Sequence, residues 1–248
     1  MYPILLSFGQ VNIYTHGVMI ALGAVLGGGI IFYLAKKEHL SRKFLFDLLV
    51  FSLFGGIVGA RIVYVIFYYY QFTNWHEMFF IWYGGLVSFG GIIGGFLVSY
   101  FILKKRRQNI WQWFDLGIIG LLAGWTIGRI GCLLSGDVPG IASSSKIAIW
   151  GQIPVSLFEA IWSFVIAGFL FYLVLWQKKW VQTWTSGSLF WGGLALYGLG
   201  RLVIDFWRDE RVILIIKGGQ IVSLLVFLLA LGILIWQYLE AAKGGKNA

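Results

Sequence analysis

Long apolar runs separated by short polar stretches make up most of this chain. Seven of these runs cover residues 14–35, 48–69, 79–103, 114–135, 153–176, 187–207 and 218–239. An α-helix needs about 20 apolar residues to cross the ~30 Å hydrocarbon core of a bilayer, whereas strands of membrane barrels alternate apolar and polar residues over about ten. The pattern therefore predicts an all-α integral membrane protein whose seven transmembrane helices form one domain over residues 1–248.

The composition supports a membrane location and excludes several kinds of site. Hydrophobic residues make up 59% of the 248 and charged residues 12%, about half of the ~25% found in soluble domains. The single cysteine excludes a disulfide framework, and the three histidines are far apart, without metal-ligand spacing. We therefore expect neither a metal ion nor another cofactor.

The basic residues predict how the helices are oriented. Twelve of the 19 lysines and arginines fall in alternate loops and at the C-terminus, and only four fall in the opposite loops. Cytoplasmic loops are the ones rich in Lys and Arg, so the N-terminus is predicted outside and the C-terminus in the cytoplasm. The net charge of +9 suggests nucleic acid as a partner, but the placement of the basic residues beside apolar runs argues against it.

Three arginines lie inside predicted helices: Arg61, Arg129 and Arg201. Each belongs to a helix predicted to run outward, about 20 residues beyond the last basic residue of the preceding cytoplasmic loop, which places all three in the outer half of the membrane. An arginine there costs about 2.5–3.5 kcal/mol on insertion scales, so we expect each guanidinium to meet an anion.

Two kinds of anion fit these arginines. One is a carboxylate of the chain: Asp205 is one helical turn beyond Arg201, and Asp137 and Glu159 lie near the outer ends of other predicted helices. The other is a phospholipid headgroup of the outer leaflet, because the planar fork of guanidinium donors suits phosphate.

Glycines crowd the start of the third predicted helix, in "YGGLVSFGGIIGG" from residue 83 to residue 95. Small residues let helices approach closely, which is the ordinary role of glycine in membrane helices. Paired glycines can also open a helix start and expose backbone N–H groups to an anion. The candidates for that second role are Gly84, Gly85, Gly90 and Gly91.

The segments "GRIGCLLSGDVPG", "IPVSLFEA" and "LYGLGRLVIDFWR" stand out among short motifs spread along nearly the whole chain. In the same order, these motifs resemble those of the prolipoprotein diacylglyceryl transferases, bacterial inner-membrane enzymes with seven spans. "GRIGCLLSGDVPG" resembles the signature Gly-Arg-x-Gly-Asn-x-x-Asn-Gly-Glu, and "IPVSLFEA" resembles His-Pro-x-x-Leu-Tyr-Glu. "LYGLGRLVIDFWR" resembles the sixth-span motif Tyr-Gly-x-x-Arg that ends in Glu-Phe-x-Arg. The other similar motifs are "YTHGVMIALG", "GARIVYVIFYY", "WYGGLVSFGG" and "GGQIVSL".

The resemblance implies a reaction, its substrates and its site. The family moves the diacylglyceryl group of phosphatidylglycerol to the lipobox cysteine of a preprolipoprotein, forming a thioether and releasing glycerol phosphate at the bacterial cytoplasmic membrane. Membrane lipids and the lipobox peptide are then the partners. By position, the resemblance implies a catalytic role for Arg129, Arg201, Tyr197 and Asp205. His16 is a further catalytic candidate, although it departs from the family pattern. It implies substrate binding by Arg61, Gly84, Gly85, Gly90, Gly91, Asp137 and Glu159.

The chain departs from the family pattern at several polar positions. Phe89 stands where the family has His or Tyr, and Asp137 and Asp205 each stand where it has Glu. His16 stands where Tyr is common. It is either a polar residue near the outer interface or, because the ordinary pKa of about 6.5 suits base chemistry, a titratable group supplied from another helix. Signature Asn, His and Tyr residues are replaced by Cys132, Ser135, Ile153 and Phe158.

These departures leave three functions open. The first is diacylglyceryl transfer to lipoproteins. The second is a paralogous enzyme that uses the same phospholipid donor with another acceptor. The third is a non-catalytic lipid-binding membrane protein that keeps the phosphate-binding arginines without the base.

Overall fold

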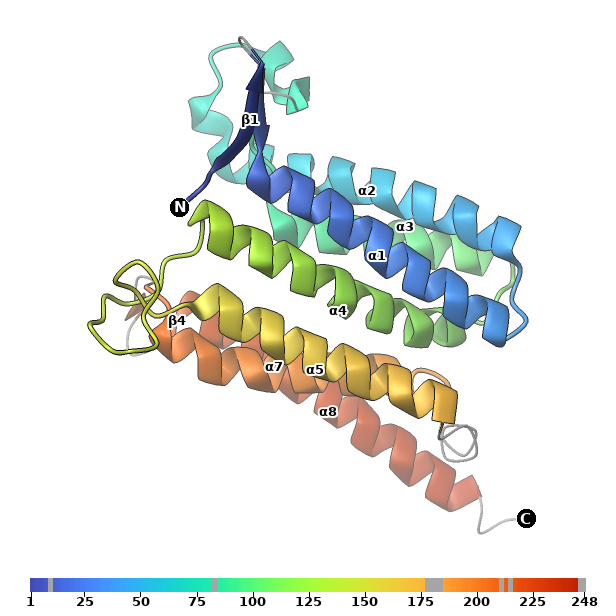
Figure 1. The fold of residues 1–248 in the computed structure, drawn as a ribbon. Helices are drawn as coiled ribbons and strands as arrows, with labels where there is room; N and C mark the ends of the chain where they lie inside the picture. The colour runs from blue at the N-terminus through green and yellow to red at the C-terminus, as the bar shows by residue number, and fades with distance from the viewer. Residues whose placement is uncertain (9–10, 82–83, 177–184, 210–211, 214–215, 245–248) are drawn as a thin grey trace. The chain divides into compact units, whose positions relative to one another are not determined.

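The computed structural model describes all of the chain except residues 9–10, 82–83, 177–184, 210–211, 214–215 and 245–248. Lys178, Lys179 and Lys246, which belong to the predicted cytoplasmic charge, therefore lie outside the described residues. Seven long helices follow one another in the described part (Figure 1): α1 (Thr15–Lys37), α2 (Arg42–Tyr68), α3 (Ser88–Lys105), α4 (Ile110–Ser135), α5 (Val155–Trp176), α7 (Ser188–Ile204) and α8 (Gly218–Gly244).

Six of these helices, counted over the described residues, are apolar and long enough to cross a membrane: α1, α2, α4, α5, α7 and α8. This confirms the predicted class, an all-α membrane protein. Large apolar side chains such as Phe54 of α2, Phe164 of α5 and Leu225 of α8 are more than half exposed in the isolated chain. Lipid tails are the environment in which such surfaces are stable.

The third predicted helix begins later than the apolar run indicates. A start at residue 79 was expected, whereas α3 begins at Ser88. The 3-10 helix η2 (Trp75–Phe79) lies before it, and Gly84 and Gly85 have φ angles of 86° and 81°. A right-handed helix cannot include such angles, so Gly84 and Gly85 belong to the connection that precedes α3.

Polar side chains mark where several helices begin. The Ser41 side chain accepts a hydrogen bond from the N–H of Phe44 at 3.3 Å and caps the start of α2. The cap of α7 comes from a different helix: Asp115 of α4 accepts hydrogen bonds from the N–H groups of Gly187, at 2.7 Å, and Phe190, at 2.8 Å. Asp115 therefore fixes the beginning of α7 against α4.

The chain divides into two compact units, Leu34–Ile110 and the remainder, Met1–Tyr33 with Trp111–Ala248. In the first of these, α2 packs on α3 where Gly59 and Gly90 face each other. In the second, α1 packs on α4 through two glycine pairs: a Cβ on Gly124 would lie 2.6 Å from the carbonyl oxygen of Gly23, and one on Gly120 would lie 2.6 Å from that of Gly27. Such close backbone contact is typical of membrane helices.

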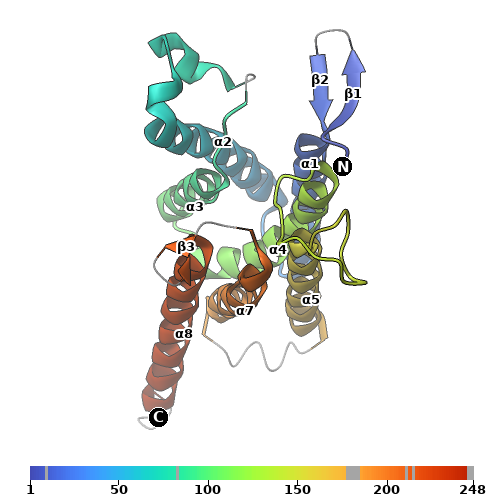
Figure 2. The same cartoon turned by 90° about the vertical axis from the view of Figure 1, so that its left-hand side faces the viewer.

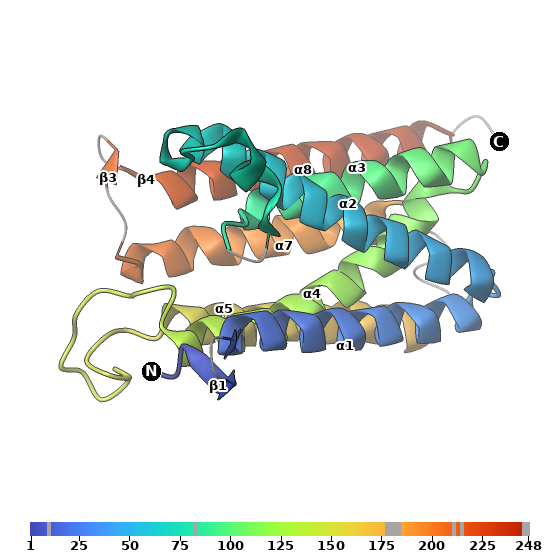
Figure 3. The ribbon, with the colours of Figure 1, turned by 90° about the horizontal axis from the view of Figure 1, so that it is seen from above.

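The buried charged residues of the larger unit lie on or next to helices α4, α5, α7 and α8. Figures 2 and 3 show α7 between α5 and α8, in agreement with its contacts to both. A small apolar cluster of Ile153, Val155 and Ile204, with Phe158 and Trp162 packed against it, joins α5 to α7 near the polar site.

Short strands, which the sequence did not indicate, precede α1 and α8. Strand β1 (Ile4–Phe8) pairs antiparallel with β2 (Val11–Tyr14), and β3 (Val212–Ile213) pairs with β4 (Ile216–Lys217). The N–H of Tyr2 donates to the carbonyl oxygen of Leu134 at 2.7 Å, so the N-terminal segment lies against the end of α4.

Candidate active site

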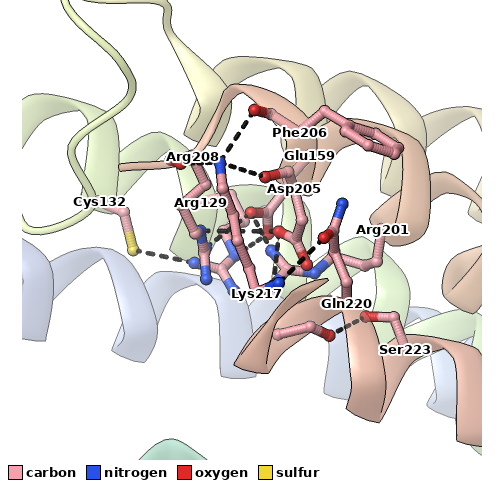
Figure 4. A network of polar contacts seen from close by, with 11 residues as sticks. Arg129, Cys132, Glu159, Arg201, Asp205, Phe206, Arg208, Lys217, Gln220 and Ser223 are labelled. Carbon is pink, nitrogen blue, oxygen red and sulfur yellow. Dashed lines mark hydrogen bonds and ion pairs between the residues drawn. The ribbon is translucent and has the colours of Figure 1, made fainter. Parts of the chain in front are cut away.

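A buried carboxylate, that of Glu159, forms the centre of the candidate site. Glu159 lies in the first turns of α5, and its side chain is 0% exposed. Its Oε2 atom lies 2.7 Å from Nε of Arg129, and its Oε1 atom accepts hydrogen bonds from Nη2 of Arg208, at 2.9 Å, and from Nη1 of Arg201 (Figure 4). One carboxylate thus joins arginines from α4, from α7 and from the segment after α7.

Asp205 is the second carboxylate of this cluster and is also 0% exposed. Its Oδ1 atom lies 3.0 Å from Nη2 of Arg201, one helical turn earlier, and 3.7 Å from Nε of Arg208. Helix α7 ends at Ile204 and continues as the 3-10 helix η4 (Asp205–Trp207). This change brings the side chain of Arg208 back to Asp205 and Glu159.

The cluster gathers more guanidinium groups than carboxylates among the described residues. Three guanidinium groups, each with a side chain 10–13% exposed, face two fully buried carboxylates. A buried charge is stable only with a partner, and each of these guanidinium groups has a carboxylate oxygen within about 3 Å.

A lysine from the segment before α8 secures the turn that carries Asp205 and Arg208. Nζ of Lys217 donates hydrogen bonds to the carbonyl oxygens of Asp205 at 3.1 Å, Phe206 at 2.9 Å and Arg208. The backbone N–H of Lys217 in turn donates to Oε1 of Gln220, at 3.1 Å, in the first turn of α8. Lys217 also adds a positive charge beside the cluster.

Arg129 links the cluster to an aromatic wall. Its guanidinium carbon lies 4.6 Å from the ring centroid of Trp125, and the ring of Trp125 meets that of Tyr197 edge to face at 6.2 Å. The Tyr197 hydroxyl is hydrogen-bonded to the Arg129 guanidinium. Tyr197 of α7 is therefore part of the same site.

His16 and Asp137 meet at the end of α4. Nδ1 of His16 lies 3.4 Å from Oδ2 of Asp137 and 3.6 Å from Sγ of Cys132. Nη1 of Arg129 donates to the same sulfur at 3.8 Å. Ser135 donates to Oδ2 of Asp137 at 2.5 Å. The structure thus brings His16 and Asp137 next to the arginine cluster, with Cys132 between.

Arg61 lies in the other compact unit and binds the backbone of its own unit. Nε donates to the carbonyl oxygen of Met78 at 2.8 Å and Nη2 to that of Glu77 at 2.7 Å. Nη1 donates to Gly84 at 2.6 Å and Gly85 at 3.0 Å. Its guanidinium is largely occupied by carbonyl oxygens, yet it also lines a cavity of about 480 Å³.

Two of the four glycines predicted to bind an anion donate their N–H groups to backbone carbonyl oxygens in the structure. The N–H of Gly84 donates to the carbonyl oxygen of Ile81, and that of Gly91 donates to Val87. Gly90 instead packs against Gly59 and Val63 of α2. Close packing and the connection to Arg61 are the roles that the structure gives these residues.

A comparison of the whole sequence with known families decides its membership. The family profile described as "Prolipoprotein diacylglyceryl transferase" matches residues 3–236. The chain belongs to this family.

Similar members of the prolipoprotein diacylglyceryl transferase family come from several bacteria. A protein of Trichormus variabilis is 30% identical over 96% of this chain and 90% of its own length. One of Halalkalibacterium halodurans is 31% identical over 97% and 87%, and one of Clostridium botulinum is 30% identical over 93% and 95%. All three are named phosphatidylglycerol–prolipoprotein diacylglyceryl transferase.

At two positions, an apolar residue that packs in the interior stands where the usual motif has a polar residue. Ile153 is buried with Val155 and Ile204, and Phe158 packs against that cluster. Phe89, in the first turn of α3, is 56% exposed. Ile153 and Phe158 therefore present no polar group to the arginine cluster of their own unit.

Arg208 and Lys217, two of the four basic residues in the predicted outer loops, also belong to the site. A signal for Arg208 was present, because residues spaced by four and then three, as Arg201, Asp205 and Arg208 are, lie on one face of a helix. No local pattern marks Lys217, since its contacts depend on how the chain returns between η4 and α8.

Proposed function

We propose that this protein transfers the diacylglyceryl group of phosphatidylglycerol to the cysteine thiol of a lipobox peptide, as the names of its relatives describe. The acceptor sulfur attacks the glyceryl carbon that carries the phosphate. A C–S bond forms, the C–O bond to phosphate breaks, and glycerol phosphate leaves with the electron pair.

The convergence of three guanidinium groups on one largely buried site carries this proposal. Phosphatidylglycerol brings a negatively charged phosphate, which is the group that the reaction has to hold and release. Guanidinium groups offer paired donors that suit phosphate oxygens. Donors fixed in a site of low water content stabilise the charge that develops on the leaving phosphate, an effect worth about 10²–10³ in rate per donor.

The two carboxylates and Tyr197 have supporting roles in this mechanism. Glu159 and Asp205 hold Arg129 and Arg201 in fixed orientations and leave the remaining donors for phosphate. Tyr197 orients Arg129 through its hydroxyl, and its ring forms the aromatic wall together with Trp125. In the other unit, the cavity lined by Arg61 and Gly84 contributes to substrate binding, and the Gly85 carbonyl oxygen helps to hold Arg61 there.

We further propose seven membrane spans, with α3 as the seventh, in the bacterial cytoplasmic membrane. The N-terminus lies outside and the basic loops face the cytoplasm, as the positive-inside rule indicates. The arginine cluster lies where α4 and α7 end and where α5 and α8 begin, which is then the outer end of these helices. A lipobox peptide exposed on the outer side reaches the cluster from there.

The test replaces each arginine by lysine and measures transfer of labelled diacylglyceryl from phosphatidylglycerol vesicles to a lipobox peptide. Arg129→Lys and Arg201→Lys are each expected to lower the rate by at least about tenfold, because lysine keeps the charge but lacks the fork of donors. Arg106→Lys is the matched control, since Arg106 is exposed after α3. It should transfer at the rate of the unaltered protein.

Two results would contradict the proposal. Near-normal transfer by both lysine variants would reduce the cluster to internal charge pairing. An unaltered protein that binds phosphatidylglycerol but modifies no lipobox peptide would point to another acceptor or to a lipid-binding protein without transferase activity.

A further inference from the structure

The start of α1 is fixed against the end of α4 by several contacts. Thr15 donates through its Oγ1 to the carbonyl oxygen of Tyr2 at 2.5 Å, and its N–H donates to Pro3 at 3.0 Å. A Cβ on Gly131 of α4 would lie 2.6 Å from Cβ of Met19 and 3.7 Å from Cα of His16. The small residue therefore allows His16 to lie directly against α4.

The carboxylate of Asp137 is fixed as closely as the imidazole that it faces. Ser135 donates to its Oδ2 atom at 2.5 Å, and the N–H of Asp137 donates to the carbonyl oxygen of Cys132 at 3.3 Å. Gly136, with a φ angle of 80°, makes the turn between the two polar residues. Oδ2 of Asp137 is thus held 3.4 Å from Nδ1 of His16.

This arrangement decides which nitrogen of His16 is available for chemistry. Nδ1 faces the Asp137 carboxylate and the Cys132 sulfur, so the proton of the neutral ring is best placed on Nδ1. Nε2, on the other side of the ring, then carries the free lone pair. An imidazole oriented by a carboxylate in this way is the arrangement of a general base.

The position of His16 also suits the proposed substrates. The side chains of His16 and Asp137 are 34% and 48% exposed, so a peptide can reach them. Cys132 connects His16 to Arg129, with Sγ 3.6 Å from Nδ1 and 3.8 Å from Nη1. The imidazole is therefore one side chain away from the proposed phosphate site.

We propose that His16 is the base that accepts the proton of the acceptor thiol, and that Asp137 is its positioning residue. This rests on the proposed function. The thiol proton moves to Nε2 of His16 while the sulfur forms its bond to the glyceryl carbon. The electron pair of the broken C–O bond remains on the phosphate oxygen beside the arginine cluster.

Charged and titratable groups from each neighbouring element act on this imidazole. Asp137 stabilises the imidazolium that forms, and Arg129, beyond Cys132, opposes it. The N-terminal segment contributes only a backbone hydrogen bond nearby, from the N–H of Tyr2 to the end of α4. A pH profile of His16 variants must therefore be compared with that of Asp137 variants.

The decisive experiment uses two acceptor peptides, one with cysteine and one with selenocysteine at the lipobox position. A thiolate is the nucleophile, and a selenol is already an anion at neutral pH, so the second peptide needs no base. His16→Gln should transfer to the cysteine peptide about 100-fold more slowly than the unaltered protein and lose the acid limb of the pH profile. It should transfer to the selenocysteine peptide within a few-fold of the unaltered protein.

His39→Gln is the matched control, because His39 is an exposed histidine that follows the other end of α1. It should behave as the unaltered protein with both peptides. Asp137→Asn should lower kcat with little change in KM for the peptide, and Asp137→Glu should restore most of the rate. A purely structural role of Asp137 would not separate kcat from KM in this way.

The outcomes separate this proposal from the proposed function. If the unaltered protein modifies neither peptide, the proposed function fails. If it modifies both, and His16→Gln either keeps its rate with the cysteine peptide or is equally slow with the selenocysteine peptide, only the role of His16 is overturned. Membrane insertion of each variant is measured alongside.

Discussion

The carboxylate of Glu159 is the most strongly connected group of the site, and its removal gives the sharpest prediction. Glu159→Gln keeps the shape of the side chain but removes one of the two negative charges that face three guanidinium groups. Breaking a buried ion pair by removing one partner costs about 3–5 kcal/mol, because the remaining charge stays buried without compensation. We therefore expect the free energy of unfolding to fall by about 3–5 kcal/mol.

This loss can be measured by titrating the protein in lipid micelles with denaturant and following its helical circular dichroism. At about 1.4 kcal/mol per factor of ten, the ratio of folded to unfolded protein should fall by at least two orders of magnitude. Glu240→Gln is the control, since Glu240 pairs with Lys243 at 3.6 Å on an exposed surface, where ion pairs contribute little. Equal stability of Glu159→Gln and the control would refute the reasoning that the cluster is a buried, mutually dependent network.

Three further predictions concern orientation, the turn before α8 and helix packing. A cysteine introduced at Ser144 should react with an impermeant thiol reagent added outside intact cells, and one at Gln108 should not; the reverse labelling would contradict the proposed orientation. Lys217→Met should lower the transfer rate about tenfold without loss of membrane insertion, because the turn from Asp205 to Arg208 loses three hydrogen bonds. An unchanged rate would show that this turn needs no support from Lys217. Gly124→Ala should destabilise the protein by about 1–3 kcal/mol in the same denaturant titration, because the added Cβ meets a carbonyl oxygen of α1. The control is Gly117→Ala on the same helix, where the added Cβ meets nothing within 4 Å. Equal stabilities of the two variants would contradict the close contact between α1 and α4.

Most helices could be predicted because a membrane span needs a long apolar run, and composition reveals such runs directly. The start of α3 could not be predicted in this way. The residues before Ser88 are as apolar as a span. The positive φ angles of Gly84 and Gly85 nevertheless keep α3 from beginning before them, and Trp75–Phe79 forms a 3-10 helix instead. Hydropathy measures whether a segment prefers lipid and does not report its backbone angles.

The site was predictable where its contacts are local. Arg201 and Asp205 are one turn apart, and their spacing alone places them together. The contacts of Glu159 with Arg201 and Arg208 join residues 42 and 49 positions apart, so they depend on how α5 and α7 are rotated about their axes. For Arg61, the sequence reveals the charge within an apolar run but not its partners. These are backbone carbonyl oxygens, which every residue carries and which no side-chain pattern can indicate.

The order in which the cluster residues occur along the chain has a consequence for biogenesis. Translation delivers Arg129 to the membrane first, and Glu159 on the next span supplies its counter-charge before Arg201 and Asp205 arrive together on one helix. Glu159 and Asp205 thus each supply a counter-charge on the next helix or on the same one, which lowers the cost of inserting Arg129 and Arg201 before Arg208 follows. Lys217 comes last and closes the turn only once the final span begins to leave the ribosome.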